Sequence, residues 1–296
     1  MSSSLSLVPF EETIWWRKSL PFFLVHLLPL GLLWTSAGFS ELALVVGLYV
    51  ARMFFITAGF HRYFAHRAYK TSRWMQFLLA FCASSSCQKG VLWWAAHHRA
   101  HHRYSDTELD IHSPKRGFWW SHVGWILCRK YQATDWARIK DFARYPELVW
   151  LNRYHLVPGI MLGVACFMLG GWRSLWAFFL STTLLYHGTF SINSLMHLWG
   201  RRRYVTTDTS RNSLLLALVT LGEGWHNNHH YYQSTANQGF FWWEVDISYY
   251  GLKILSWLGL VWDLRTPPPH VLAANRIADA AAELPYEEPN ARGKVW

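Results

Sequence analysis

Four apolar stretches constrain this chain more than any other feature, because each approaches the length of a helix that crosses a membrane. They cover about residues 20–38, 42–60, 156–171 and 175–196. A bilayer core needs roughly 20 apolar residues per helix, so the third stretch is short for a span. The turns within the two pairs, SAGFSE and GWR, are also short. The pattern predicts four membrane-spanning helices, and the expected fold class is an all-α integral membrane protein.

Basic residues are concentrated in the two long segments that follow these pairs, 61–155 and 197–296. The positive-inside rule therefore places both segments and both termini in the cytoplasm, at a bacterial-type inner membrane. A net charge of +10 would also suit a nucleic-acid partner, but anionic lipid or a phosphate-bearing substrate fits a membrane chain better. We therefore expect membrane lipid and no nucleic acid among the partners.

Histidines gather in short motifs within these basic segments. The spacing H-x-x-H-H occurs twice, with His98, His101 and His102 in one motif and His226, His229 and His230 in the other. Residues at positions i, i+3 and i+4 lie on one face of a helix. Each motif is therefore expected to point its three imidazoles in one direction.

A third motif, HRYFAHR, holds His61 and His66. Five residues correspond to about 140° around an α-helix, so these two side chains are expected to diverge. Such a pair would either reach two different metal ions or straddle the end of the second apolar stretch.

Together the three motifs supply eight imidazoles, which is too many for one ion because a zinc site takes four ligands. Two metal ions that share them are therefore expected. Imidazole binds Zn, Cu, Fe and Ni, but structural zinc normally recruits cysteine, and no cysteine lies near these motifs. Iron is the favoured metal. In the fourth apolar stretch, a stripe of Thr189, Asn193 and His197 would add His197 as a ninth ligand and Asn193 as the holder of a metal-bound water.

The other histidines have no comparable spacing. We expect structural roles for His26, His187 and His270, and no metal partner for His112, His122 and His155. His97 adjoins the motif of His98 but does not fit its spacing. Asp106, Asp110 and Glu223 lie close enough to the motifs to hydrogen-bond the ligands from behind. The sequence has no G-x-S-x-G elbow, P-loop or complete G-x-G-x-x-G, so nucleophilic catalysis and nucleotide binding find no support.

The chain resembles the membrane fatty-acid desaturases, and more closely their stearoyl-CoA (acyl-CoA Δ9) branch, in four segments: ITAGFHRYFAHRAYK, HRAHHRYSDTELDIHSPKRGFWWSHVGW, INSLMHLWG and GEGWHNNHH. The resemblance covers about residues 45–132 and 185–262. It implies four transmembrane helices under a cytosolic helical cap that holds a di-iron centre. A single domain would then occupy residues 1–270, with the cap at 61–155 and 197–265 and a peripheral tail at 271–296.

By the same resemblance, the nine histidines and Asn193 are the ligands of two irons: His61, His66, His98, His101, His102, His197, His226, His229 and His230. Gln88, Trp94 and Thr189 match residues that bend an acyl tunnel, while Arg129 and Lys130 match a basic pair beside the phosphates of coenzyme A. The branch carries Asn, Arg and Asp where this chain has Lys89, Ala96 and His97. Loss of that Arg–Asp pair leaves room for an acyl-lipid substrate, although acyl-CoA is the first expectation.

The implied reaction is an O2-dependent removal of two vicinal hydrogens from a saturated acyl chain, which leaves a cis double bond, at Δ9 by analogy. Two electrons would come from a separate ferredoxin-like or cytochrome b5-like protein with its reductase, because the sequence has no haem-binding or cysteine-rich segment. Tyr49 and Met53, four apart before His61, are hypothesised to form the tunnel floor that sets chain length. The open alternatives are a hydroxylase or ketolase on the same core and, outside enzymes, a metal or haem transporter.

Overall fold

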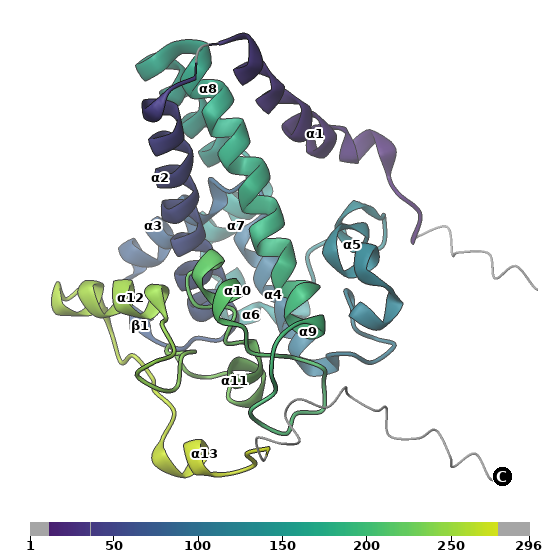
Figure 1. Ribbon diagram of the computed structural model, residues 1–296, viewed down its shortest axis with the longest axis vertical. Helices are drawn as coiled ribbons and strands as arrows, with labels where there is room; N and C mark the ends of the chain where they lie inside the picture. The colour runs from purple at the N-terminus through teal and green to yellow at the C-terminus, as the bar shows by residue number, and fades with distance from the viewer. Residues whose placement is uncertain (1–11, 36, 278–296) are drawn as a thin grey trace, which may run out of the picture.

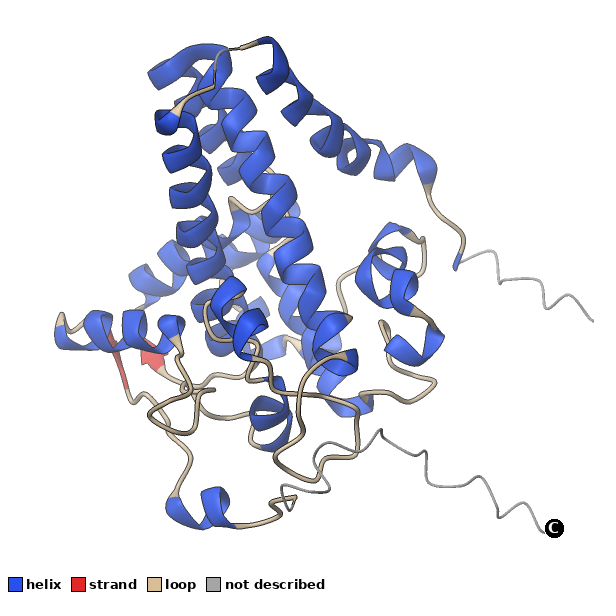
Figure 2. Cartoon of the chain, in the orientation of Figure 1, coloured by secondary structure: helices blue, strands red, loops and turns tan. Residues whose placement is uncertain are grey.

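A computed structural model of the protein describes residues 12–35 and 37–277. Helices dominate it, and the strands are limited to one short pair (Figure 2). The first apolar stretch forms α1 (Trp16–Leu27) and the 3-10 helix η2 (Leu28–Trp34), and the second forms α2 (Phe39–Phe55). Without interruption, α2 continues as a π-helix, η3 (Ile56–Ala65).

The third and fourth apolar stretches lie in one long element, α8 (Val157–Asn193), whose helical backbone breaks at Gly170 and Gly171. Gly171 has a φ of 61°, a conformation that glycine adopts without the clash of a side chain. A Cβ on Gly163 would lie 3.3 Å from the ring of Phe178. Since these residues are equally far from the break, the two limbs of α8 fold back against each other.

Two of the described helices are long and apolar enough to cross a membrane, Phe39–Ala65 and Val157–Leu198. They run side by side in the upper part of Figure 1, where α1 diverges from them. Buried Arg52 joins them, because its guanidinium donates to the hydroxyls of Ser181 and Thr182 at 2.7 and 2.8 Å. The expected total of four spans exceeds this finding and stays a prediction.

The remaining elements lie around the lower half of the long helices in Figure 1. Before α8 the chain forms β1 (Lys70–Thr71), α3 (Arg73–Ser84), α4 (Val91–Tyr104), η4 (Pro114–Arg116), η5 (Trp120–Gly124), α5 (Trp125–Leu127), η6 (Trp136–Arg138), α6 (Lys140–Ala143) and α7 (Pro146–Arg153). After α8 it forms α9 (Leu195–Leu198), α10 (Leu214–Val219), α11 (His226–Tyr231), α12 (Ile247–Trp257), β2 (Val261–Trp262) and α13 (Pro269–Ala273).

The largest hydrophobic core lies where η3 packs against α3 and α4. Phe60, Phe64, Leu79 and Leu92 are fully buried there. Strands β1 and β2 close one side as an antiparallel pair in which Lys70 faces Trp262. This core fixes the π-helix against α4, and both elements carry histidine motifs. Of the predicted tail at 271–296, residues 278–296 lie outside the described residues, so the proposed division into domain and tail stays a prediction.

Candidate metal centre

The nine predicted histidines come together in two adjoining groups. Within each group, the ring nitrogens that could bind an ion all lie within 4.8 Å of one another. The first group consists of His61, His66, His98, His102 and His229, and the second of His101, His197, His226 and His230. The ring centroids of His102 and His230 are 4.4 Å apart, so the two groups adjoin.

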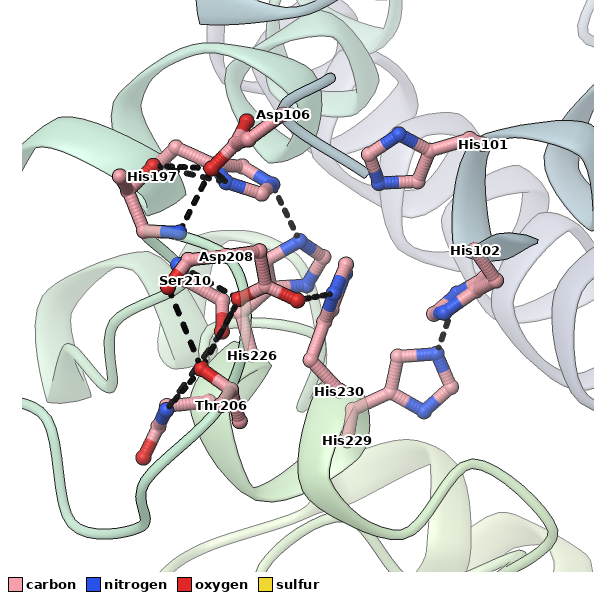
Figure 3. Close-up of polar contacts among 12 residues, drawn as sticks. His101, His102, Asp106, His197, Thr206, Asp208, Ser210, His226, His229 and His230 are labelled. Carbon is pink, nitrogen blue, oxygen red and sulfur yellow. Dashed lines mark hydrogen bonds and ion pairs between the residues drawn. The ribbon is translucent and has the colours of Figure 1, made fainter. Parts of the chain in front are cut away.

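In the first group the Nε2 atoms point at one another. His98 Nε2 lies 3.0 Å from His66 Nε2 and 2.9 Å from His102 Nε2. His229 Nε2 lies 3.0 Å from the Nε2 atoms of both His61 and His102, the second of which is drawn in Figure 3. In the second group, His226 and His197 approach through Nε2 atoms 3.2 Å apart.

The two H-x-x-H-H motifs are divided between the groups, which corrects the expectation that each points in one direction. His98 and His102 belong to the first group, whereas His101 belongs to the second. His226 and His230 belong to the second group, whereas His229 belongs to the first. On a helix, residues i and i+4 lie close together on one face, and residue i+3 lies to the other side of i. Each motif can therefore supply ligands to both adjoining groups.

The expected divergence of His61 and His66 is wrong, because the segment that carries them is a π-helix. The amide of His66 donates to the carbonyl of His61 at 3.1 Å, five residues back, as in a π-helical turn. The wider turn brings positions i and i+5 onto one face. The two rings are 4.8 Å apart, and both join the first group.

Carboxylates lie behind four of the histidines at their Nδ1 atoms. The expected partners all take part: Glu223 contacts His61, Asp110 contacts His101 at 3.0 Å and Asp106 lies 3.5 Å from His197. Sequence reasoning missed a fourth, Asp208, whose Oδ2 accepts from His230 Nδ1 at 2.7 Å (Figure 3). Its only sequence signal is its position in the turn TTDTS, well before the motif that it serves.

Burial and these contacts set the charges of the site. Burial holds the pKa of five rings well below the usual histidine value, so they are neutral: His66, His98, His102, His226 and His229. Burial raises the pKa of Asp106, but its bonds to His197 and Thr209 outweigh burial and lower it to about 2. Burial thus keeps these five imidazoles neutral, whereas Asp110 raises the pKa of His101 beside it.

This arrangement fits metal ions. A carboxylate at Nδ1 fixes the proton on that nitrogen and leaves the Nε2 lone pair facing the group centre. Lone pairs that face one another at about 3 Å repel unless a cation lies between them. The buried Nε2 of His230 has no hydrogen-bond partner among the described residues. Two nitrogens bound at right angles to one ion at about 2.1 Å would also be roughly 3 Å apart, which matches the observed spacings.

Other histidines take different positions. His112 forms a third potential metal-binding group with His101 and Asp110, which its sequence spacing did not reveal. His97 hydrogen-bonds the carbonyl of Trp93 at 2.8 Å and lies outside all three groups. His26, His187 and His122 form a chain of ring nitrogens 3.1 and 3.0 Å apart that ends at Ser194.

A largely apolar cavity of about 260 Å³ leads to the first group. Its lining includes His61, His98 and Glu223 at the metal centre and Phe22 and Val25 of α1. An apolar chain that filled this cavity would therefore lie beside the first histidine group.

The residues matched to the tunnel bend line this cavity. Gln88 Nε2 donates to Thr189 Oγ1 at 3.0 Å, and both side chains border the space. Trp94 stacks on His98 with ring centroids 4.9 Å apart. Half-buried Asn193 also borders the cavity, at the last residue of α8. All four residues therefore line the cavity, and Trp94 connects its wall to His98.

The hypothesised floor residues lie elsewhere. Tyr49 donates its hydroxyl to the carbonyl of Val219 at 2.8 Å, and Met53 is fully buried against Ile56 and Leu185. Neither belongs to the cavity lining, although Ile56 does. Their influence on chain length stays a prediction, and it would be transmitted through Ile56.

The matched basic pair is also outside the cavity lining. Lys130 forms an ion pair with Glu12 at 2.8 Å, and the Arg129 guanidinium lies 5.4 Å from the ring centroid of Trp15. Both side chains thus contact the N-terminal segment. Their predicted role at a phosphate group stays a prediction.

Comparison with known proteins agrees with this geometry. The family model for fatty acid desaturases matches residues 40–246, which include all nine histidines of the two groups. The chain belongs to the fatty acid desaturase family. This desaturase is therefore an oxidoreductase that acts on fatty acyl chains.

Curated relatives cover most of this desaturase. An sn-1 stearoyl-lipid 9-desaturase from Synechocystis is 37% identical over 84% of the chain and 78% of the relative. A Delta-9 acyl-lipid desaturase from Arabidopsis thaliana is 39% identical over 72% of the chain and 70% of the relative. An sn-2 palmitoyl-lipid 9-desaturase from Nostoc is 36% identical over 72% of the chain and 77% of the relative.

Proposed function

We propose that this desaturase introduces a cis double bond at Δ9 of a saturated acyl chain that is esterified in a membrane lipid. The observation that carries the proposal is the apolar cavity that reaches the first histidine group, with Trp94 stacked on His98 beside it. An apolar cavity beside the metal centre can select which carbons meet it, because reaction depends on near-attack placement.

The lipid form of the substrate, rather than acyl-CoA, is supported in two ways. The relatives described above carry names that specify a lipid-bound chain. In addition, Ala96, at a position that the acyl-CoA branch uses for an arginine, is fully buried in the main core. The buried methyl group of Ala96 cannot make the polar contact that an arginine at that position would make.

Two irons are the proposed cofactors, held by the five and four histidines of the two groups. Asn193, beside the cavity, would hold a metal-bound water. Iron supplies the activation of O2 that hydrogen removal needs. The chain's own part is to keep imidazoles neutral by burial, to orient four of them through Glu223, Asp106, Asp110 and Asp208, and to exclude bulk water.

We further propose that the protein crosses the membrane four times, through α1 with η2, through α2, and through the two limbs of α8. Support comes from the apolar side chains that these helices expose. They include Leu24, Leu33, Leu42, Val46, Ile160, Val164 and Leu169. A surface of that kind is stable in lipid and is aggregation-prone in water. The histidine groups and the elements around them would then form a cytoplasmic cap.

One experiment tests the reaction and the substrate together. The chain is expressed in a host that lacks desaturases, and its lipids are analysed by mass spectrometry with double-bond localisation. We expect Δ9-unsaturated chains in intact lipids. Purified protein supplied with an electron donor should then act on stearoyl phospholipid in vesicles and leave stearoyl-CoA unchanged.

A His229→Ala variant is the negative control, because His229 lies at the centre of the first group. Product from stearoyl-CoA alone would overturn the lipid assignment. An alcohol or a ketone in place of an alkene would indicate a hydroxylase or ketolase and overturn the desaturation.

A further inference from the structure

A second, polar pocket reaches the first histidine group through ligands that the apolar cavity does not touch. We call it the outer pocket, and its lining consists of Ala65, His66, Arg99, His102, Arg103, Gln233 and Ser234. The apolar cavity is lined instead by His61 and His98. The first group therefore has two approaches, one apolar and one polar.

The outer pocket is where the metal centre comes nearest to the surface. His66 and His102 are half-buried, whereas the other seven histidines of the two groups are buried. The Nε2 atoms of His66 and His102 point into the group, so the outer edges of these rings face the pocket. Anything that exchanges electrons with the centre from outside meets these two imidazoles first.

The rim of the outer pocket is positively charged. Arg103 is exposed, stacks over Tyr104 at 5.6 Å and has no carboxylate partner within residues 12–35 and 37–277. Arg99 uses both Nη atoms to bind Asp141 at 2.9 Å, and exposed Arg67 shares the same carboxylate at 3.5 Å. The guanidinium of Arg138, which pairs with Asp135, lies 5.4 Å from the ring centroid of the same Tyr104. Four guanidinium groups against two carboxylates leave a net positive charge.

We propose that the outer pocket is the docking site of an acidic one-electron carrier protein of the ferredoxin class. The inference rests on the proposed reaction, in which the saturated chain, O2, two electrons and two protons give the alkene and two waters. The substrate supplies two of the four hydrogens in the two waters, so two electrons and two protons come from elsewhere. A positive rim attracts and orients an acidic partner.

The test is a direct binding measurement with purified full-length protein in lipid nanodiscs and an acidic [2Fe–2S] ferredoxin as the probe. Arg103→Glu reverses the charge of the exposed rim arginine. Ser234→Glu adds a negative charge from a different element and leaves every arginine in place. Arg153→Glu is the matched control, because Arg153 is also exposed at the end of a helix and stacks over its neighbour Tyr154 at 5.5 Å.

We expect Arg103→Glu and Ser234→Glu each to weaken binding at low salt by at least about fivefold, mainly through slower association, and to flatten its salt dependence. Arg153→Glu should bind as the wild type does, and basic cytochrome c should not bind. Iron content, measured in parallel, should be unchanged. Wild-type affinity in both rim variants at unchanged iron content would overturn the docking site.

A second readout separates this proposal from the proposed function. With a small chemical reductant in place of ferredoxin, the rim variants should form as much product as the wild type. Equal product with the reductant and equal ferredoxin binding would retain the reaction and reject the docking site. Absence of product in every variant, with binding still lost at the rim, would reject the reaction and retain the docking site.

Discussion

The two histidine groups differ in how firmly the protein encloses them. The first group has five imidazoles, two of which are half-buried, and, in the part of the chain that the structure describes, a single carboxylate, Glu223, behind it. The second group has four imidazoles, all buried, and three carboxylates behind it: Asp106, Asp110 and Asp208. The apolar cavity and the outer pocket both reach the first group.

The difference shows that openness and electrostatic support are divided between the groups. Negative charge behind the second group stabilises a cation there and orients its rings. The first group has less of this electrostatic support, but the apolar cavity and the outer pocket make it accessible to substrate and to the surface. We therefore expect the first ion to be the more reactive and the second to be the more tightly held.

The largest effect should follow from the removal of a ligand. His229→Ala takes one nitrogen from the centre of the first group, and His226→Ala takes one from the second. Both should lose more activity than the roughly 10–100-fold typical of changes behind the ligands. Iron analysis should show that His229→Ala retains about one iron per chain. If His229→Ala keeps two irons and full activity, the grouping is wrong.

Carboxylate substitutions should have the next largest effect. Asp208→Asn removes the charge behind His230 and should weaken iron binding by about 10–100-fold without unfolding the protein. Glu223→Gln should in addition destabilise the fold, because Glu223 shares fully buried Arg62 with Asp246. Removal of one partner from a buried ion pair costs about 3–5 kcal/mol. Thermal unfolding and metal titration of both variants measure the contrast, and equal unfolding midpoints would contradict it.

Chelation should separate the groups kinetically. A small chelator added to the iron-loaded protein should remove one iron rapidly through the outer pocket and the second several-fold more slowly. Stopped-flow absorbance of the chelator complex gives both rates. A single phase that releases two irons would show that the groups are equally accessible and would remove the distinction between them.

The smallest effect concerns the chain length of the product. Met53→Ala creates space beneath Ile56, which lines the cavity, and should lengthen the preferred acyl chain by a few carbons. Met75→Ala is the control, because Met75 is equally buried in the main core but outside the cavity lining. Fatty-acid profiles of cells that express each variant measure the change. Identical profiles would place chain-length selection elsewhere.

The sequence predicted the composition of the centre better than its connectivity. All nine histidines could be named from their spacing, and three of the four carboxylates could be named because they lie within a few residues of a motif. Glu223 and Asp106 nevertheless contact histidines of distant segments, His61 and His197. That His61 and His66 belong to the same group could not be predicted, because the residue spacing does not distinguish a π-helix from an α-helix. Asp208 was missed because only the tertiary fold brings its turn beside His230.

The fold was predicted to a similar degree. The apolar stretches located the long helices, and the short GWR turn begins at Gly171, where the helical backbone of α8 breaks. Residue spacing could not show how the two H-x-x-H-H motifs divide between the groups, because that depends on how α4 and α11 approach each other. The lining of the cavity, to which α1 contributes, likewise depends on tertiary packing.

The exchange of histidines between motifs has a consequence for biosynthesis. Both groups include residues of α11, and His61 must meet His229, 168 positions later in the chain. Neither site is complete until that late segment has left the ribosome and docked. We therefore expect metal binding to be completed late in maturation, because a nascent chain that stalls before residue 226 lacks ligands of both sites.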